Sequence, residues 1–300
     1  MTELQNMIWI EKFRPQTLSE IILKDKEKNV IKNYIKTSNL LPSFIFFSKS
    51  PGTGKTSLAK IIINELKCDS LKLNSSEERG IDSIRDKVSM FAKSLSTNGI
   101  KRCIFLDEAD GLTKQAQDSL RNLMETYSDN AFFIFSCNDF TKIIDPIKSR
   151  CISINFQFPD KRSIFDKIFI ICKEENIEGS VSSLVEYYYP DIRSMIAELQ
   201  EAKLSGNPLE FKYQRFEDFL ELIKKKDFET IKDIVYSTPF NFKAFNKWFF
   251  SYIFQNYDKY GFENARKMIN FLAETEKFSS LNVNLEVIFI ANIMEISKSL

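Results

Sequence analysis

The sequence predicts an α/β fold, in which a parallel sheet with crossover helices is followed by two all-helical parts. Three observations predict it. In residues 43–158 short apolar runs alternate with amphipathic helical stretches, the strand-like runs stop at Pro159, and the chain after Pro208 has a helical pattern throughout. Parallel strands need helix-length crossovers between them, which is the arrangement that this alternation indicates.

Each predicted strand is a short apolar run bounded by polar or turn residues. The five runs are residues 44–48, 70–74, 103–106, 132–136 and 151–156. Between them, apolar residues recur with helical spacing over residues 56–66, 81–95 and 114–127. The first half of the chain therefore has the pattern of a parallel α/β sheet.

The chain beyond Pro159 is predicted to be helical. Helical spacing covers residues 161–175, 181–189 and 192–204, and residues 205–208 (SGNP) have the composition of a linker. The length of 300 residues is enough for about two domain-sized cores. We therefore expect a sheet domain at 1–158, a small helical domain at 159–205 and an all-helical domain at 206–300.

Aromatic residues recur at spacings of three and four in the last part, which places most of them on one helix face. They are Phe242, Phe245, Trp248, Phe249, Tyr252 and Phe254. An ordinary helical core explains this stripe better than a platform for stacking bases. Burial of the same surface against neighbouring subunits is compatible with a core and stays open.

The composition excludes several classes of site. The chain has no histidine, five cysteines and a net charge of +1. Without imidazole there is no Ser/His/Asp or Cys/His nucleophile, so any catalysis must use carboxylates, Lys, Arg, backbone amides and bound cations. The cysteines form no CxxC pair, so we expect reduced thiols. A charge near zero allows nucleic-acid contact only through a local patch.

The first residues predict no export or membrane insertion. Residues 1–15 include Glu3 and Glu11 and lack the apolar core of a signal peptide. The apolar runs are far shorter than the ~20 residues that cross a bilayer. We expect a cytoplasmic protein with no membrane partner.

A glycine-containing loop joins the first strand to the next helix. Residues 49–56 are KSPGTGKT. Glycines let backbone N–H groups turn toward phosphate oxygens, and the helix N-terminus adds partial positive charge. In such a P-loop Lys55 reaches the β- and γ-phosphates, while Thr56 holds Mg²⁺. Lys49 stands where the strict pattern has glycine, which puts the entry turn in question. The predicted nucleotide-binding residues here are Pro51, Gly52, Thr53, Gly54, Lys55, Thr56 and Ser57.

A second motif is the apolar run at 103–106, which ends in Asp107 and Glu108. Beside a P-loop, this Walker B pattern predicts that Asp107 holds the metal and that Glu108 orients or polarises the attacking water. A solvated turn is the other explanation of an acidic strand end, and the P-loop disfavours it. Residues 107–110 also spell DEAD, but a DEAD-box helicase needs a second RecA-like domain, which the helical C-terminal third does not supply.

In these motifs the chain resembles the clamp-loader branch of the AAA+ ATPases, namely the small subunits of replication factor C and still more the ATPase subunit of T-even phage clamp loaders. The opening WIEKFRP (9–15) is similar to the family's WxEKYRP. The other matching segments are 50–56, 79–82, the Walker B strand, 117–127, 136–138, 149–151 and 190–193. Beyond Pro208 the resemblance rests on length and helical character alone. It implies an AAA+ P-loop parallel-sheet domain, a small helical lid and an all-α C-terminal collar.

The resemblance also implies roles for residues outside the P-loop. Phe13 and Arg14 belong to the opening that packs beside the adenine. Asn138 matches sensor 1, which bonds the γ-phosphate or the water. Arg150, in the SRC motif at 149–151, would act in trans on ATP held by a neighbouring subunit. Arg193 matches sensor 2, although the family's GDxR is PDIR here and a surface position stays an alternative.

Residues 72–102 contain a modest excess of basic side chains, for which a solvated face is the default explanation. The basic residues are Lys72, Arg79, Arg85, Lys87, Lys93, Lys101 and Arg102. In the family, helices that begin near Ile81 and Lys114 track duplex DNA. Helix N-termini are good phosphate contacts, so Arg79, Gly80, Ile81, Thr113 and Lys114 are the predicted DNA-binding residues.

The helix that begins near Ile81 ends with residues that face the clamp in the family. Met90 and Phe91 are therefore the predicted clamp contacts, and core packing is the alternative for both.

The resemblance implies an ATPase with ATP and Mg²⁺ as cofactors, which opens a sliding clamp and loads it on primer-template DNA. Its partners would be the clamp, the DNA and other loader subunits in a ring or spiral, expected to be pentameric. Its place would be the replication fork, in the host cytoplasm if the source is viral. One alternative is another DNA-associated AAA+ ATPase, such as a helicase loader or branch-migration motor. The other is a nucleotide-binding scaffold without catalysis, which the intact Lys55, Thr56, Asp107 and Glu108 disfavour.

Overall fold

The computed structural model describes residues 8–37, 41–75, 81–94, 99–156, 159–206, 208–209, 216–237, 240, 242–278 and 284–300. The chain forms two compact units. The first comprises Met1–Val181 and Tyr189–Asn207, and the second comprises Ser182–Tyr188 and Pro208–Leu300. The predicted division of the first 205 residues at 158/159 stays a prediction.

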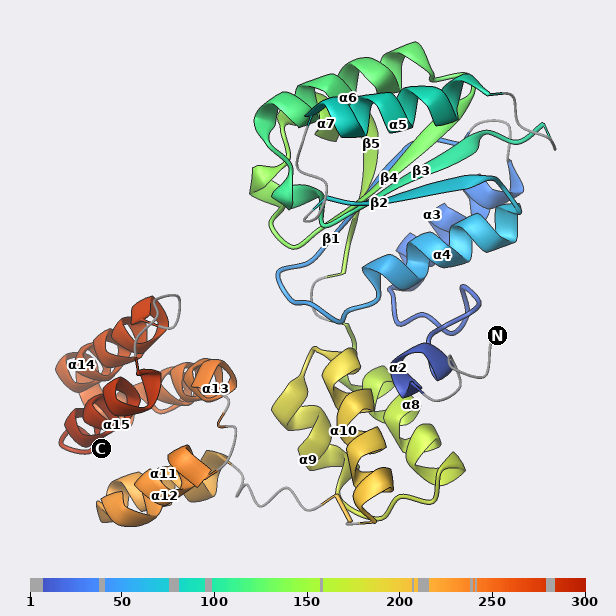
Figure 1. Ribbon diagram of the computed structural model, residues 1–300. Helices are drawn as coiled ribbons and strands as arrows, with labels where there is room; N and C mark the ends of the chain where they lie inside the picture. The colour runs from blue at the N-terminus through green and yellow to red at the C-terminus, as the bar shows by residue number, and fades with distance from the viewer. Residues whose placement is uncertain are drawn as a thin grey trace. The chain divides into compact units, whose positions relative to one another are not determined.

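The first unit is built on a five-stranded parallel sheet in the order β2-β3-β4-β1-β5 (Figure 1). The strands are β1 (Ser43–Phe47), β2 (Ser70–Asn74), β3 (Arg102–Asp107), β4 (Ala131–Cys137) and β5 (Cys151–Asn155). All five predicted strands are confirmed. Because β3 and β4 are neighbours, with Leu106 opposite Phe135, the polar residues that follow them come together at one edge of the sheet.

Helices cover both faces of this sheet (Figure 1). One face carries α5 (Ile81–Lys93), α6 (Lys114–Thr126) and α7 (Asp145–Lys148). The other carries α3 (Asp25–Lys36) and α4 (Lys55–Leu66). The helices predicted at 56–66, 81–95 and 114–127 are confirmed, and α5 ends at Lys93, two residues before its predicted end. The helix α3 and the short helix α7 were not predicted.

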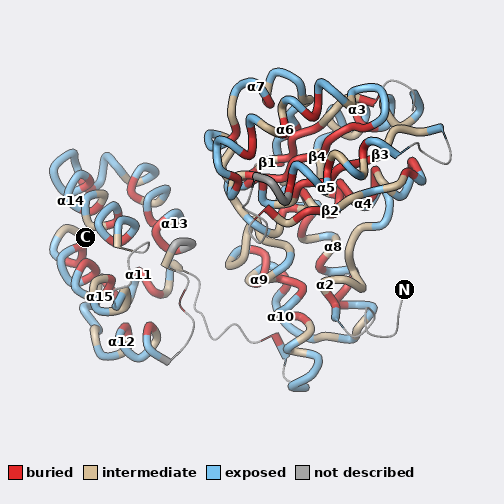
Figure 2. The backbone as a smooth tube through the Cα atoms, turned by 45° about the horizontal axis from the view of Figure 1, so that its top comes forward, coloured by how far each residue is buried: buried red, intermediate tan, exposed pale blue. Residues whose placement is uncertain are grey.

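The sheet is apolar on both faces because each face packs against helices. All seven residues of β4 are buried, and Figure 2 shows buried residues concentrated along the strands. Val88 of α5 and Leu120 of α6 pack in the core on one side. Ile31 of α3 and Leu58 of α4 pack in the core on the other.

Below the sheet in the view of Figure 1, the first unit also contains α2 (Trp9–Lys12), α8 (Lys161–Glu174) and α10 (Ile192–Ser205). We call α8 and α10 the lid helices. The backbone N–H of Trp9 donates to Gln200 Oε1 of α10 at 3.0 Å, and Lys12 forms an ion pair with Glu175 just after α8. The start of the chain is thereby tied to the lid helices.

The second unit is helical, as predicted. It contains α11 (Phe216–Lys225), α12 (Phe228–Ser237), α13 (Phe242–Gln255), α14 (Tyr257–Phe278) and α15 (Leu285–Ile296), and it takes in most of α9 (Val181–Tyr188). Phe245 and Phe249 of the predicted aromatic stripe are fully buried, so a helical core is confirmed for them, while Phe254 is 57% exposed. No helix in the described part of the chain is long and apolar enough to cross a membrane.

All five cysteines are free. Cys151 is partly buried, and the other four are buried. The expectation of unpaired thiols is therefore confirmed, and these side chains serve as small apolar packing groups.

Candidate active site

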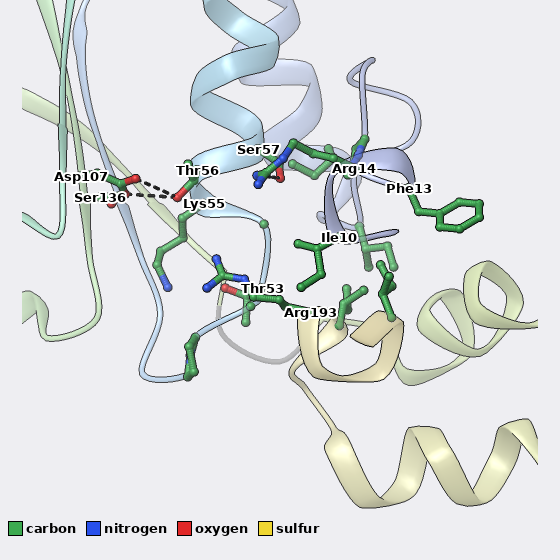
Figure 3. A pocket seen from close by; sticks show the side chains of 18 of the residues that line it. Ile10, Phe13, Arg14, Thr53, Lys55, Thr56, Ser57, Asp107, Ser136 and Arg193 are labelled. Atoms are coloured by element: carbon green, nitrogen blue, oxygen red, sulfur yellow. Dashed lines mark hydrogen bonds between the residues drawn. The ribbon is translucent and has the colours of Figure 1, made fainter. Parts of the chain in front are cut away.

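A pocket with a cavity volume of about 120 Å³, partly open to solvent, lies at the carboxyl ends of β1, β3 and β4 (Figure 3). Its walls come from the P-loop, the two strand ends, the segment before α3 and the first turn of α10. All the predicted nucleotide-binding residues line it: Phe13, Arg14, Pro51, Gly52, Thr53, Gly54, Lys55, Thr56, Ser57 and Arg193. So do four of the predicted catalytic residues, Lys55, Asp107, Glu108 and Asn138.

The two P-loop glycines adopt a backbone conformation that side chains disfavour. Gly52 has φ of 68° and Gly54 has φ of 104°. A Cβ on Gly52 would lie 1.7 Å from Asp191 Oδ1, so this glycine also permits the start of α10 to approach the loop. Lys49 is exposed, and its φ angle is not positive. The loop therefore enters its turn without needing a glycine at this position.

Lys55 is buried at the bottom of the loop. Its ammonium donates to Asn138 Oδ1 at 2.9 Å, to the Ser50 carbonyl at 3.1 Å and to Ser48 Oγ at 3.2 Å. Burial lowers the pKa of Lys55, and nearby acidic groups including Asp110 oppose part of that shift. The P-loop lysine and the strand-end asparagine, which are 83 residues apart, thus meet in one pocket.

Asp107 and Thr56, the two residues predicted to hold Mg²⁺, are in direct contact. Thr56 Oγ1 donates to Asp107 Oδ1 at 3.1 Å and lies 3.3 Å from Oδ2. Ser136 Oγ also donates to Oδ1, and Lys72 Nζ lies 3.1 Å from Oδ2. A hydroxyl and a carboxylate side by side are hard oxygen donors, and Mg²⁺ in nucleotide sites is held by such groups together with substrate phosphates. The donor set therefore fits this ion.

Glu108 stands on strained backbone at the end of β3. Its φ and ψ are 56° and 43°, a left-handed conformation that is uncommon for a residue with a side chain. The backbone N–H of Glu108 donates to Ser136 Oγ at 3.1 Å, which holds the turn in place. Such strain concentrates at functional sites. The Glu108 side chain is exposed and lines the pocket.

The residues from the start of the chain line the pocket in different ways. Arg14 Nη1 donates to Ser57 Oγ at 3.2 Å, and its guanidinium also pairs with Glu11. The Phe13 ring packs edge-on against Trp9 at 5.4 Å between centroids, and in Figure 3 it points away from Lys55. Arg14 is therefore fixed to α4 beside the P-loop.

Arg193 lies in the first turn of α10, whose N-cap is Asp191. The Asp191 side chain accepts from the backbone N–H of Ser194 at 3.2 Å. Arg193 lines the pocket with its Cβ beside Gly52, and Figure 3 shows its side chain reaching toward Thr53. The positively charged Arg193, from the lid helix α10, therefore borders the pocket on this side.

Several pocket residues were not predicted. They are Ile10, Pro15, Ile21, Ile22, Ser136, Cys137, Lys167, Ile192 and Ile196. Ser136 could have been found from the strand order, because it is the last residue but one of β4, the strand that pairs with the Walker B strand β3. Burial raises the pKa of Cys137 to about 12, so this thiol stays protonated near neutral pH and is no nucleophile.

Arg150, predicted to act in trans, does not line this pocket. Its guanidinium forms an ion pair with Glu125 of α6 and donates to the Pro146 carbonyl at 2.8 Å. The Arg150 side chain is 38% exposed. It is therefore positioned at the surface, where a neighbouring molecule can reach it.

The predicted DNA contacts are only partly described. Arg79 and Gly80 lie outside the described residues, as does the side chain of Ile81, the first residue of α5. Thr113 caps α6 by accepting from the backbone N–H of Ala116 at 3.2 Å, and Lys114 is exposed beside it. The N-terminus of α6 is thus open to solvent.

The predicted clamp contacts differ in exposure. Met90 is 74% exposed, whereas Phe91 is half-buried against the core. The Arg102 guanidinium lies 4.8 Å from the centre of the Phe91 ring. Arg102 and Lys72, counted in the basic patch, form ion pairs with Asp69 and Asp107, so they are partly neutralised within the chain.

Comparisons with known proteins agree with this geometry. The family model described as "ATPase family associated with various cellular activities (AAA)" matches residues 44–159. The replication factor C small subunit of Haloarcula marismortui is 42% identical over 68% of this chain and 64% of its own length. The protein of the same name from Picrophilus torridus is 38% identical over 75% of this chain and 72% of its own. The chain thus spans less than two thirds of the Haloarcula relative.

Among solved structures, the Thermotoga maritima RuvB Holliday junction branch migration motor matches with a TM-score of 0.55 and 17% identity. The match covers 79% of this chain and 85% of that one. At this identity the likeness shows the fold alone. Nothing in these comparisons tests the predicted likeness to phage loaders, which stays a prediction.

Proposed function

The chain belongs to the replication factor C small-subunit family, and we propose that it is an ATP-hydrolysing subunit of a sliding-clamp loader. The observation that carries the proposal is one pocket that brings together the P-loop, both Walker B carboxylates, Asn138 and Arg193. A phosphate cradle without these carboxylates would support binding only. The branch-migration alternative shares the fold with its structural neighbour, whereas the family membership supports a loader.

The P-loop residues bind the nucleotide in this proposal. The backbone of residues 51–54 surrounds the phosphates, and Lys55 exchanges its contact with Asn138 for phosphate oxygens. Thr56 and Asp107 would hold Mg²⁺, which when bound neutralises charge on the β- and γ-phosphates. Arg14 and Phe13 lie on the side where the base would rest, and Arg193 closes on the phosphates from α10.

Hydrolysis in this proposal depends on Glu108 and on a second molecule. Glu108 orients the attacking water, and Asn138, once released from Lys55, bonds that water or the γ-phosphate. Arg150 of the adjacent subunit stabilises the charge on the transferred group. Because Arg150 does not line its own pocket, an isolated subunit should hydrolyse ATP slowly.

The partners in this proposal are the clamp, primer-template DNA and further loader subunits at the replication fork, in the cytoplasm. The exposed N-terminus of α6, with Thr113 and Lys114, supports phosphate contact without base readout. Arg79, Gly80 and Ile81 are proposed to join it. Met90 is exposed enough to enter a pocket on the clamp, and Phe91 would back it.

The test is the rate of ATP turnover of the assembled protein with and without clamp and primer-template DNA. We expect both together to raise the rate at least tenfold, because they align subunits and complete each site. Glu108→Gln should bind ATP normally and lose turnover by about 10² to 10⁴. Full-rate hydrolysis by the monomer, with no response to clamp or DNA, would overturn the proposal.

A further inference from the structure

Lys72 brings a positive charge to the carboxylate that is proposed to hold the metal. It lies on β2, opposite Phe105 of β3, and Asn74 is opposite Asp107. Lys72 Nζ lies 3.1 Å from Asp107 Oδ2 and 5.5 Å from the centre of the Phe105 ring. The Lys72 ammonium thus reaches from β2 to Asp107, which lines the pocket.

The partners of Asp107 differ in charge. Oδ1 accepts from the hydroxyls of Thr56 and Ser136, and Oδ2 contacts Thr56 and Lys72. The two hydroxyls fix the orientation of the carboxylate without charge. Among these three partners only Lys72 carries a charge, and it is the most mobile in principle because its side chain is 51% exposed.

We propose that Lys72 sets the metal requirement of this pocket by competing with Mg²⁺ for the Asp107 carboxylate. In the absence of metal the ammonium neutralises Asp107, whose side chain is only 16% exposed. A cation bound at Oδ2 must replace the ammonium, and one bound at Oδ1 must lie beside it. Lys72 is therefore a positioning residue, because it acts through Asp107.

This inference rests on the proposed function, since it concerns the metal–nucleotide site. It predicts that removing the Lys72 charge strengthens the coupling between Mg²⁺ and nucleotide. Both cations are attracted to one carboxylate and repel each other, so loss of the ammonium leaves the metal without a competitor. Because Lys72 is half-exposed, solvent screens its repulsion of the metal. We therefore expect the coupling between Mg²⁺ and nucleotide binding to change only roughly tenfold.

The structure offers a matched control lysine. Lys60 of α4 has a 43% exposed side chain, close to that of Lys72, and it lies 3.6 Å from Glu11 rather than contacting Asp107. Burial lowers the pKa of Lys60, the charges of Arg14 and Lys72 lower it further, and Glu11 opposes the shift. Lys60→Met removes the same charge from the same region without touching the carboxylate.

The experiment measures the dissociation constant of a fluorescent, non-hydrolysable ATP analogue in EDTA and at saturating Mg²⁺. The ratio of the two constants is the factor by which the metal tightens binding. We expect this factor to be roughly tenfold larger in Lys72→Met and Lys72→Gln than in the wild type. Lys72→Arg, which keeps the charge, and Lys60→Met should have the wild-type factor.

Three results would overturn the inference. If the factor in both neutral variants equals or falls below that of the wild type, Lys72 does not compete with the metal. A change of the same size in Lys60→Met would show a general effect of surface charge. Failure of the wild-type chain to bind the analogue in either condition would overturn the proposed function too, whereas binding with an unchanged factor overturns this inference alone.

Discussion

The two units of the molecule differ in where their buried polar side chains lie. In the first, Lys55, Thr53 and Ser136 are buried polar residues that line a cavity. In the second, Asn292 donates to Thr275 inside a unit whose core is built around aromatic side chains such as Phe245 and Phe289. The difference teaches that buried polar side chains mark a site where they line a cavity, whereas those that bond one another inside a core link packed helices.

Substitutions in the two units should therefore affect different properties, turnover in the first and stability in the second. A substitution at the edge of the site in the first unit should change turnover while the fold stays intact. A substitution in the aromatic core should change the stability of the second unit while nucleotide binding stays intact. Each of the following predictions can break that separation.

The largest effect is expected from Arg150→Ala. The arginine is outside its own pocket and held at the surface by Glu125, so its loss should not disturb nucleotide binding. Clamp- and DNA-stimulated hydrolysis should fall by about 10³ or more, the range measured for arginine fingers. Steady-state turnover of the assembled protein and binding of a fluorescent nucleotide check both parts.

The control for Arg150 is Arg162→Ala, which removes an exposed arginine from α8. It should hydrolyse ATP at the wild-type rate. Wild-type turnover in Arg150→Ala, or a loss of nucleotide binding equal to its loss of turnover, would show that the arginine does not act as proposed.

A smaller effect, on stability alone, is expected from Phe245→Ala in α13. The Phe245 ring is fully buried and contacts Phe219, Phe249 and Phe289. Its removal should cost about 3–5 kcal/mol in the unfolding of the second unit, through lost burial and the cavity left behind. Chemical denaturation followed by tryptophan fluorescence measures it, since Trp248 packs in this core.

Phe250→Ala is the matched control on the same helix, because Phe250 is 45% exposed. This substitution should lower the free energy of unfolding of the second unit by less than about 1 kcal/mol. If Phe245→Ala weakened nucleotide binding as strongly as it weakened the second unit, the two units would not be separable in the way described.

The smallest effect is expected from Asn292→Ala, which tests a buried polar group that lies outside any site. Asn292 Nδ2 donates to the Phe271 carbonyl at 3.1 Å and to Thr275 Oγ1 at 2.9 Å, linking α15 to α14. Losing both hydrogen bonds should lower the free energy of unfolding of the second unit by about 1–2 kcal/mol. Thermal unfolding measures this loss of stability. The control is Asn264→Ala, an exposed position at which the substitution should hardly change stability. ATP turnover should be unchanged in both variants.

Much of the first unit could be predicted because its signals are local. Each strand is an apolar run, and the P-loop and Walker B residues follow directly from strand ends, so their convergence follows from parallel pairing. Asn138 comes close to Asp107 and Glu108 for the same reason, because it follows β4, the neighbour of β3. The contacts of Lys72 and Ser136 with Asp107 depend on side-chain reach across neighbouring strands, which no local pattern encodes.

Other features could not be predicted for different reasons. The left-handed backbone of Glu108 depends on a hydrogen bond to Ser136 from another strand. The approach of Asp191 to Gly52 depends on how α10 packs. In the second unit helical spacing predicted an all-helical part without the bounds of its helices, and the choice of Phe245 and Phe249 for the core over Phe254 depends on which helices pack together.

The central claim is that ATP bound by one subunit is hydrolysed with the arginine of another. The most direct test mixes two variants, Lys55→Ala, which cannot hold the phosphates, and Arg150→Ala, which cannot complete a neighbour's site. Each alone should have almost no stimulated turnover with clamp and primer-template DNA. Their mixture should recover turnover, because an intact pocket then meets an intact arginine. A mixture as inactive as its components, or full turnover by Arg150→Ala alone, would contradict the claim.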